Sequence, residues 1–205
     1  LTYAQFDRRA RAIAARLQDM GLAGQRVLLV YPPGLDFITA FFGCLYAGCT
    51  AVPTYAPRRN RLLDRFQAIV ADAGVSIALS TSSAAAQFQG MIGPKSGQTT
   101  LLSKLPWLAT DEISNDQAEQ WSEPAIASDA LAMLQYTSGS TSHPKGVMIS
   151  YSNLMENART IHDAFGIQRQ VNCVFWLPTY HDMGLIGGVL VPAIAGITNI
   201  ILSPA

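Results

Sequence analysis

The sequence predicts an α/β protein built on a mainly parallel sheet that is flanked by helices on both faces. Helix-like and strand-like segments alternate along the chain, with glycines or prolines between them. The strand-like segments are continuously apolar, which is typical of parallel strands buried on both sides. Hydrophobic residues make up 49% of the 205 residues and charged residues only 14%, against about 25% in an average globular protein, so we expect extensive burial.

Each expected helix combines an amphipathic or wholly apolar repeat with a recognisable end. The first begins with the capping box Thr2-x-x-Gln5 and ends before Gly21. The second, at 35–47, is apolar nearly all round, as a helix packed on several sides would be. The third is stopped by Gly74. In chain order the expected helices are 2–20, 35–47, 63–73, a helix capped near Ser152 and a helix from about Gly184.

The expected strands are short apolar runs that follow the helices. In chain order they are 27–31, 50–53, 75–80, 130–136, 146–149, 171–177 and 198–202. The stretch 103–129 differs, because it carries six acidic residues against the single Lys104. We expect it to be a solvated excursion from the sheet.

Charge and cysteine content exclude several classes of function. Lys plus Arg number 14 and Asp plus Glu number 14, so no net field favours nucleic acid or an anionic membrane as a partner. The three cysteines contain no CxxC pair, which fits neither a disulfide framework nor a zinc site, so we expect buried thiols in a reducing cytoplasm and no resident metal. Glycines and prolines interrupt the uncharged windows 37–57 and 183–205, which favours buried α/β segments over transmembrane spans. No secretory signal is visible.

The two ends of the sequence predict a piece of a longer polypeptide. The chain starts at Leu1, directly before a helix cap, and stops in an apolar run after Ile197. A sheet edge of this kind is normally covered, so we expect further chain to cover it.

The candidate chemistry lies in a loop between two expected strands. Residues 136–146 read YTSGSTSHPKG and provide hydroxyls, a flexible glycine and one cation: Thr137, Ser138, Gly139, Ser140, Thr141 and Lys145. Hydroxyls, free backbone N–H groups and an ammonium group suit a polyphosphate. The Walker A pattern GxxxxGK[ST] is absent from the sequence, and an ordinary Ser/Thr-rich turn is the alternative.

The order of residues in this loop resembles the phosphate-binding loop of the adenylate-forming superfamily, which includes acyl-CoA synthetases, peptide-synthetase adenylation domains and luciferases. The stretch 176–188, WLPTYHDMGLIGG, is similar to the superfamily's next motif in the form used by fatty acyl-AMP ligases. Residues 55–59, Arg61, Arg65 and 71–73 resemble the same branch. The likeness implies that residues 1–205 are an incomplete N-terminal portion of the large subdomain of an acyl-adenylate-forming enzyme, with the small C-terminal domain absent. Ser142 departs from the loop's commonest pattern, which has glycine there.

The resemblance also implies a reaction. A fatty acid carboxylate would attack the α-phosphorus of Mg-ATP to give acyl-AMP and pyrophosphate, and Mg²⁺ would arrive with ATP. The acyl group would then pass to the phosphopantetheine thiol of an acyl carrier protein, in a polyketide or non-ribosomal peptide assembly line. The residues Thr137, Ser138, Gly139, Ser140 and Thr141 would wrap the β- and γ-phosphates, Lys145 would pair with them, and His181 would stand beside the reacting carboxylate. The 205 residues alone are expected to be inactive.

Three alternatives stay open. The enzyme could be an acyl-CoA synthetase or a peptide-synthetase-type adenylation domain. It could be a serine hydrolase using Ser138 or Ser140, although the sequence has no GxSxG elbow. It could also be a binding module that holds nucleotide or carrier protein without turnover. For His181, the alternative is an ordinary half-buried histidine.

Overall fold

A six-stranded sheet forms the centre of the protein. The computed structural model describes residues 1–54, 60–92, 104–137 and 144–202. The strand order is β4-β3-β1-β2-β5-β6, and all neighbouring strands pair parallel except β5 and β6. The strands are β1 (Arg26–Val30), β2 (Thr50–Thr54), β3 (Ile77–Ser80), β4 (Trp107–Ala109), β5 (Leu131–Thr137) and β6 (Lys145–Ser150). The predicted mainly parallel α/β fold is therefore confirmed.

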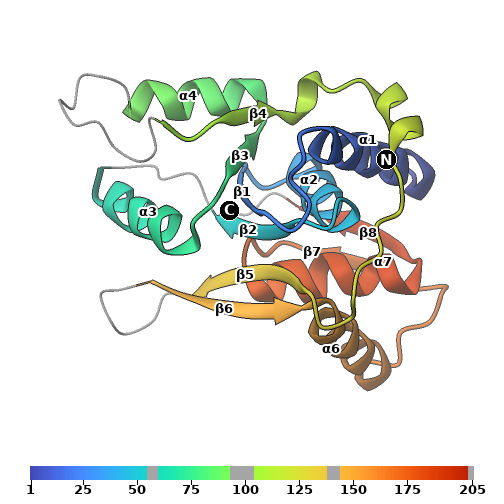
Figure 1. Ribbon diagram of the computed structural model, residues 1–205. Coiled ribbons are helices and arrows are strands. Elements are labelled where there is room, and N and C mark those ends of the chain that lie inside the picture. The colour runs from blue at the N-terminus through green and yellow to red at the C-terminus, as the bar shows by residue number, and fades with distance from the viewer. Residues whose placement is uncertain (55–59, 93–103, 138–143, 203–205) are drawn as a thin grey trace.

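Helices cover both faces of this sheet, as predicted. Figure 1 shows α1 (Tyr3–Asp19) and α2 (Leu35–Tyr46) on one side of the strands, and α3 (Asn60–Ala73) and α4 (Ser82–Ile92) on the other. Successive side chains of β1 alternate between the two cores: Val27 and Leu29 pack with α1 and α2, whereas Leu28 and Val30 pack with α3 and α4. Because the strand is buried on both faces from Val27 to Val30, each of these positions is apolar, which explains the continuous apolar runs in the sequence.

The last third of the described chain packs against the α1 and α2 face. It contains α6 (Tyr151–Ala164), β7 (Asn172–Phe175), the π-helix η4 (Met183–Leu190), α7 (Val191–Ala195) and β8 (Thr198–Ile201). Strands β7 and β8 pair parallel in a second, two-stranded sheet, with Cys173 opposite Asn199. Leu154 of α6 and Leu185 of η4 enter the same core as α1 and α2. Within the described ranges, none of the helices combines the length and apolarity that crossing a membrane requires.

Residues 104–129, the described part of the predicted excursion 103–129, are largely exposed but also contribute to the sheet. The segment supplies the edge strand β4, which pairs with β3, and then the 3₁₀ helices η2 (Thr110–Glu112) and η3 (Asn115–Gln120). Of these, η3 lies along α1, and η2 contacts α2, α4 and β3. Arg9 of α1 donates hydrogen bonds to the carbonyls of Thr110 and Ile113, and the indole of Trp121 donates to the carbonyl of Tyr46 at 2.9 Å. The acidic residues are largely exposed, but the intervening apolar residues pack on the helices, so this segment is part of the fold.

Three helices also differ from the prediction. The N-cap of α6 is Ser150, two residues before the predicted cap, because the side chain of Asn153 completes the capping box by accepting from Ser150 N at 3.1 Å. Ser152 lies in the first turn instead, with its hydroxyl 2.8 Å from that of Ser150. Helix α4 was not predicted at all. The helix expected from about Gly184 is present but has π-helical hydrogen bonding.

Candidate active site

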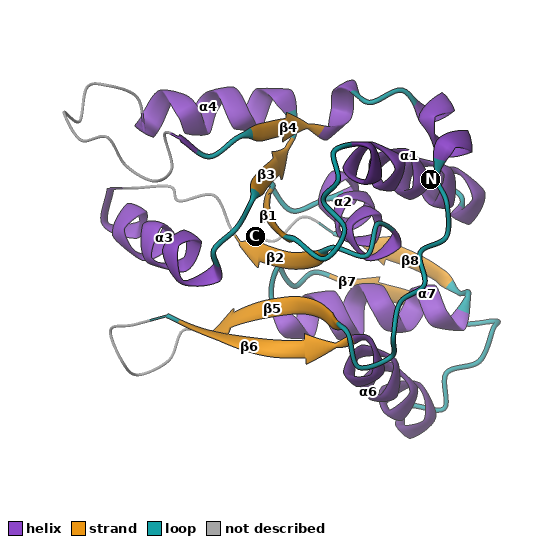
Figure 2. Cartoon of the chain, viewed as in Figure 1, coloured by secondary structure: helices purple, strands orange, loops and turns teal. Residues whose placement is uncertain are grey.

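The two ends of the predicted phosphate loop meet in the β5–β6 hairpin. Thr137, the last residue of β5, pairs with Lys145, the first residue of β6, and both are exposed. Figure 2 shows β5 and β6 side by side. The other predicted phosphate-binding residues lie outside the described residues: Ser138, Gly139, Ser140 and Thr141. The antiparallel pairing brings the hydroxyl-bearing end and the cationic end of the loop to one place at the edge of the sheet.

The hairpin is closed by a tight contact between Tyr136 and Gly146. A Cβ atom on Gly146 would lie 2.9 Å from Cζ of Tyr136, so the ring occupies the space that any larger residue would need. The Tyr136 hydroxyl donates to Oδ2 of Asp72 at 2.5 Å. Burial, and after it this hydrogen bond to a carboxylate, raises the pKa of the Tyr136 phenol above its ordinary value. Tyr136 therefore has a structural role, because its ring and its hydroxyl fix the hairpin.

His181 lies in a turn directly before η4. Its backbone N–H donates to the carbonyl of Pro178 at 3.1 Å, and its carbonyl accepts from the N–H of Leu185 at 2.7 Å. The ring atom Nδ1 is 2.5 Å from Oδ1 of Asp182, and the same carboxylate oxygen caps η4 by accepting from the N–H of Met183 at 2.7 Å. The carboxylate thereby orients the imidazole and leaves Nε2 as the nitrogen available to a ligand.

The exposure of His181 bears on the alternative interpretation of this residue as an ordinary half-buried histidine. Its side chain is 67% exposed, so it is not the half-buried histidine of the alternative. Its backbone is anchored and its ring is oriented by Asp182, whose side chain is 55% exposed. A fixed, accessible imidazole is suited to contacting a bound substrate.

Two glycines of the same motif allow η4 to pack closely on the preceding chain. A Cβ atom on Gly184 would lie 2.1 Å from the carbonyl oxygen of Pro178, and one on Gly188 would lie 2.4 Å from Cδ1 of Phe175. At Gly187 a Cβ atom would make only an ordinary contact, at 3.7 Å from Phe175. Gly184 thus sets the position of the His181 turn against η4. The glycines of GLIGG, which in the sequence only argued against a transmembrane span, were the available signal for this close packing.

A hydrogen bond connects the hairpin to the histidine turn. Nε2 of Gln135, two residues before Thr137, donates to the carbonyl of Tyr180 at 3.4 Å, one residue before His181. Gln135 is only 8% exposed, and its Oε1 has no partner among the described residues. A buried amide in an otherwise apolar strand was the available signal for this residue, and the sequence analysis missed it.

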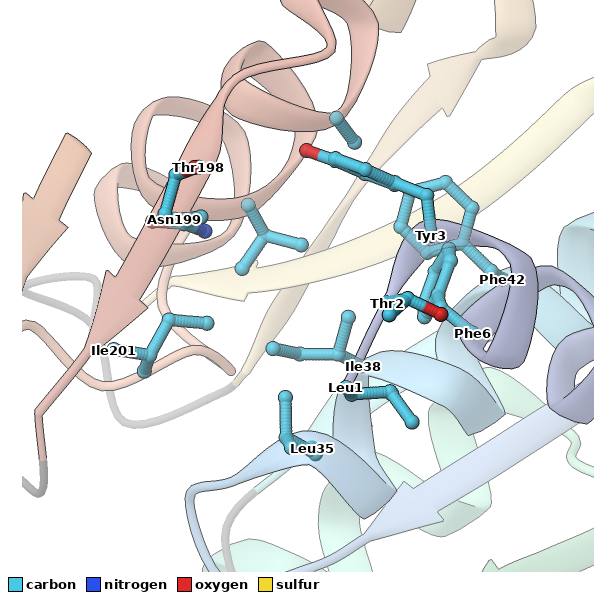
Figure 3. A pocket seen from close by; sticks show the side chains of 12 residues that line it. Leu1, Thr2, Tyr3, Phe6, Leu35, Ile38, Phe42, Thr198, Asn199 and Ile201 are labelled. Atoms are coloured by element: carbon cyan, nitrogen blue, oxygen red, sulfur yellow. The ribbon is translucent and has the colours of Figure 1, made fainter. Parts of the chain in front are cut away.

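A separate apolar cavity of about 350 Å³ lies between α1, α2 and the η4–β8 region (Figure 3). Phe6, Ile38 and Phe42 line it from the first two helices, and Asn199 and Ile201 from β8. Asn199 is held there because its Nδ2 donates to the carbonyl of Gly188 at 2.7 Å. None of the site residues predicted from the sequence that the structure describes lines this cavity.

The described part of the chain contains no group of three or more His, Cys, Asp or Glu side chains that could hold a metal ion. Cys44 and Cys49 are buried free thiols, as predicted, and Cys173 is partly exposed.

A family model described as AMP-binding enzyme matches residues 1–205. This chain belongs to the AMP-binding enzyme family. The chain is 41% identical to the medium-chain-fatty-acid–[acyl-carrier-protein] ligase JamA of Moorena producens (strain JHB), over all of this chain and 34% of that protein. It is 39% identical to the long-chain-fatty-acid–AMP ligase FadD32 of Mycolicibacterium smegmatis (strain ATCC 700084 / mc(2)155), over 95% of this chain and 30% of that protein.

Solved structures agree with this assignment. The crystal structure of a fatty acid AMP ligase from Legionella pneumophila superposes with a TM-score of 0.90 at 44% identity, over all of this chain and 34% of that one. A fatty acyl-adenylate ligase from L. pneumophila in complex with acyl adenylate and pyrophosphate superposes with a TM-score of 0.87, also at 44% identity, with the same coverage. The resemblance of the AMP-binding chain to fatty acyl-AMP ligases is therefore confirmed, and the chain spans about a third of the length of these relatives.

Proposed function

We propose that this chain is the N-terminal portion of the large subdomain of a fatty acyl-AMP ligase, which activates a fatty acid with ATP. The observation that carries the proposal is the connected arrangement of the two motifs. Thr137 and Lys145 face each other across the hairpin, and the Gln135–Tyr180 hydrogen bond ties this hairpin to the turn that presents His181. A phosphate-binding loop and a group that contacts the carboxylate must lie close together for one acid to attack one nucleotide.

In the proposed reaction a carboxylate oxygen of the fatty acid forms a bond to the α-phosphorus of Mg-ATP. The bond from that phosphorus to the oxygen bridging the α- and β-phosphates breaks, and its electron pair leaves with pyrophosphate. The nucleophile is weak and the leaving group is highly charged, so orientation and charge neutralisation should dominate catalysis.

Each site residue then has a role in that step. Lys145 neutralises charge on the β- and γ-phosphates, and His181 orients the carboxylate without acting as a base. The remaining hydroxyls and N–H groups of the loop bind the same phosphates: Thr137, Ser138, Gly139, Ser140 and Thr141. Mg²⁺ arrives as part of the nucleotide substrate and shields the phosphate oxygens.

We further propose that the acceptor of the acyl group is the phosphopantetheine thiol of an acyl carrier protein, in a cytoplasmic polyketide or non-ribosomal peptide assembly line. The name of the relative JamA, an acyl-carrier-protein ligase, supports this acceptor. Coenzyme A is the alternative acceptor.

The cysteines support the proposed cytoplasmic location. Cys44 and Cys49 are buried and form no disulfide, which suits a reducing compartment.

The test uses the full-length protein that carries this chain. Exchange of labelled pyrophosphate into ATP should require a fatty acid, and acyl transfer should then be measured by mass spectrometry with carrier protein or coenzyme A as acceptor. Exchange that does not depend on any fatty acid would reject acid activation. Covalent labelling of Ser138 or Ser140 by a fluorophosphonate would instead favour the hydrolase, and nucleotide binding without exchange would favour the binding module.

A further inference from the structure

Helix α3 contacts the β5–β6 hairpin at the point where the phosphate loop begins. Figure 1 shows α3 beside the end of the hairpin from which the loop departs. Two side chains of α3 make the contact: Arg65 Nη2 donates to the carbonyl of Thr137 at 3.0 Å, and Asp72 Oδ2 accepts from the hydroxyl of Tyr136 at 2.5 Å. The two contacts fall on consecutive hairpin residues, one on the main chain and one on a side chain.

The spacing of these two residues places them on one face of the helix. Seven residues correspond to almost two complete turns, so Arg65 and Asp72 point in nearly the same direction. Neighbouring positions on another face, Phe66 and Val70, are 4% and 1% exposed and enter the core with α4 and the sheet. The core therefore fixes how α3 is rotated, and that rotation presents the two polar side chains to the hairpin.

The far end of α3 is held independently. Arg26 of β1 donates from Nη1 to the carbonyl of Ala73 at 2.7 Å, which is one of the unpaired carbonyls at the C-terminus of the helix. Asp72 is the adjacent residue. Through this bond the central strand β1 fixes the end of α3 from which Asp72 binds Tyr136. The hairpin is therefore connected to the sheet by these side-chain contacts as well as by strand pairing.

The charges on the two α3 residues are not used in an ion pair with each other or with any described neighbour. Among the residues that the structure places, neither Arg65 nor Asp72 lies within 4.0 Å of an opposite charge. The Nε atom of Arg65 is buried and has no hydrogen-bond partner among the described residues. Among the described residues, the contact that holds this half-buried arginine is the carbonyl of Thr137, which places Arg65 beside the neighbouring site.

We propose that Arg65 and Asp72 are positioning residues for the phosphate-binding hairpin. They hold Tyr136 and Thr137, and since Thr137 pairs with Lys145, they also hold the Lys145 backbone in register with the opposite end of the loop. This inference rests on the proposed function. It assigns a role to Arg65 and Asp72, two of the residues whose pattern resembles the fatty acyl-AMP ligases.

The experiment compares variants of the full-length protein with Asp64→Asn, an exposed carboxylate on the same helix, as the matched control. Tyr136→Phe and Arg65→Gln should each lower kcat/KM for ATP by about tenfold in the fatty-acid-dependent exchange reaction, as expected for loss of a charge-assisted hydrogen bond. KM for the fatty acid should not change. Arg65→Lys keeps a cationic donor and should recover most of the loss. Asp64→Asn should behave as wild type.

A second measurement does not depend on turnover. Hydrogen–deuterium exchange without ligands should speed up at the amides of β6 in Tyr136→Phe and Arg65→Gln, while the amides of α1 and α2 keep their protection. If the wild type has no exchange activity but the β6 amides loosen in the variants, the proposed function falls and the positioning role stands. Unchanged protection of the β6 amides in both variants would overturn the positioning role, whether or not activity falls. In that case the replaced side chains would either contact the substrate directly or have no part in the reaction.

Discussion

Replacing Gly184 by alanine tests the geometry that positions His181. The added Cβ atom would lie 2.1 Å from the carbonyl oxygen of Pro178 and 2.8 Å from its carbonyl carbon. Since real Cβ atoms do not approach other atoms within 3.0 Å, the turn and η4 must separate by about 0.9 Å. Both contacts are backbone atoms, so no side chain can rotate away to relieve the overlap.

The cost of this overlap follows from its size. Overpacking of a well-packed site destabilises a protein by about 1–3 kcal/mol, and a catalytic group misplaced by about 1 Å can lower the rate roughly 100-fold. We therefore expect Gly184→Ala to lower the free energy of unfolding by about 1–3 kcal/mol. The kcat/KM of this variant for the fatty acid should fall by about 10- to 100-fold.

Gly187→Ala on the same helix is the control. Its Cβ atom would make an ordinary contact at 3.7 Å. Alanine also favours a helix over glycine by roughly 1 kcal/mol, so stability should be unchanged or slightly higher. Urea denaturation and exchange kinetics of both variants of the full-length protein give the comparison. Equal stability and equal fatty acid kcat/KM in the two variants would refute the argument that Gly184 sets the His181 turn.

Further predictions concern the thiols and one carboxylate. Burial raises the pKa of Cys49 to about 12 and the pKa of Cys44 well above its ordinary value, so iodoacetamide at pH 8 should label Cys173 before either of them, as read by peptide mass spectrometry. Equal labelling in the native protein would contradict the packing of α2 and β2. Burial acts to raise the pKa of Asp111, but hydrogen bonds from the first turn of α4 outweigh it and lower the pKa. The carboxylate therefore stabilises the fold above its unfolded pKa of about 3.9, and Asp111→Ala should lower the urea midpoint at pH 7 by an amount that shrinks as the pH falls through the lowered pKa. A pH-independent difference would exclude the charge as the cause.

The sheet and most of its helices were predictable because their signals are local. The capping box Thr2–Gln5 forms as expected, with Gln5 N donating to Thr2 Oγ1 at 3.2 Å, and the apolar runs became buried strands. Helix α4 was not predicted because it is rich in Ser and Ala and has no clear amphipathic pattern. Its first turn is held by Asp111, a residue 29 positions away in the sequence. Strand β4 is only three residues long and exists through its pairing with β3. Such elements depend on tertiary contacts that no local pattern shows.

The candidate site divides in the same way. Lys145 and His181 could be named as candidates from the sequence because each lies in a contiguous motif, and both residues are exposed in the structure. The contact between Asp72 and Tyr136 joins residues 64 apart in the sequence, and the bond from Gln135 to Tyr180 joins residues 45 apart. These supporting contacts require the folded chain, since neither partner predicts the other.

The most direct test of the phosphate-binding role of the hairpin is the affinity of the full-length protein for ATP with and without the ammonium group of Lys145. Isothermal titration calorimetry should show that Lys145→Ala weakens ATP binding by about 10- to 100-fold, as for loss of a charge-assisted contact, while fatty acid affinity stays the same. ATP affinity equal to wild type in that variant would contradict the account.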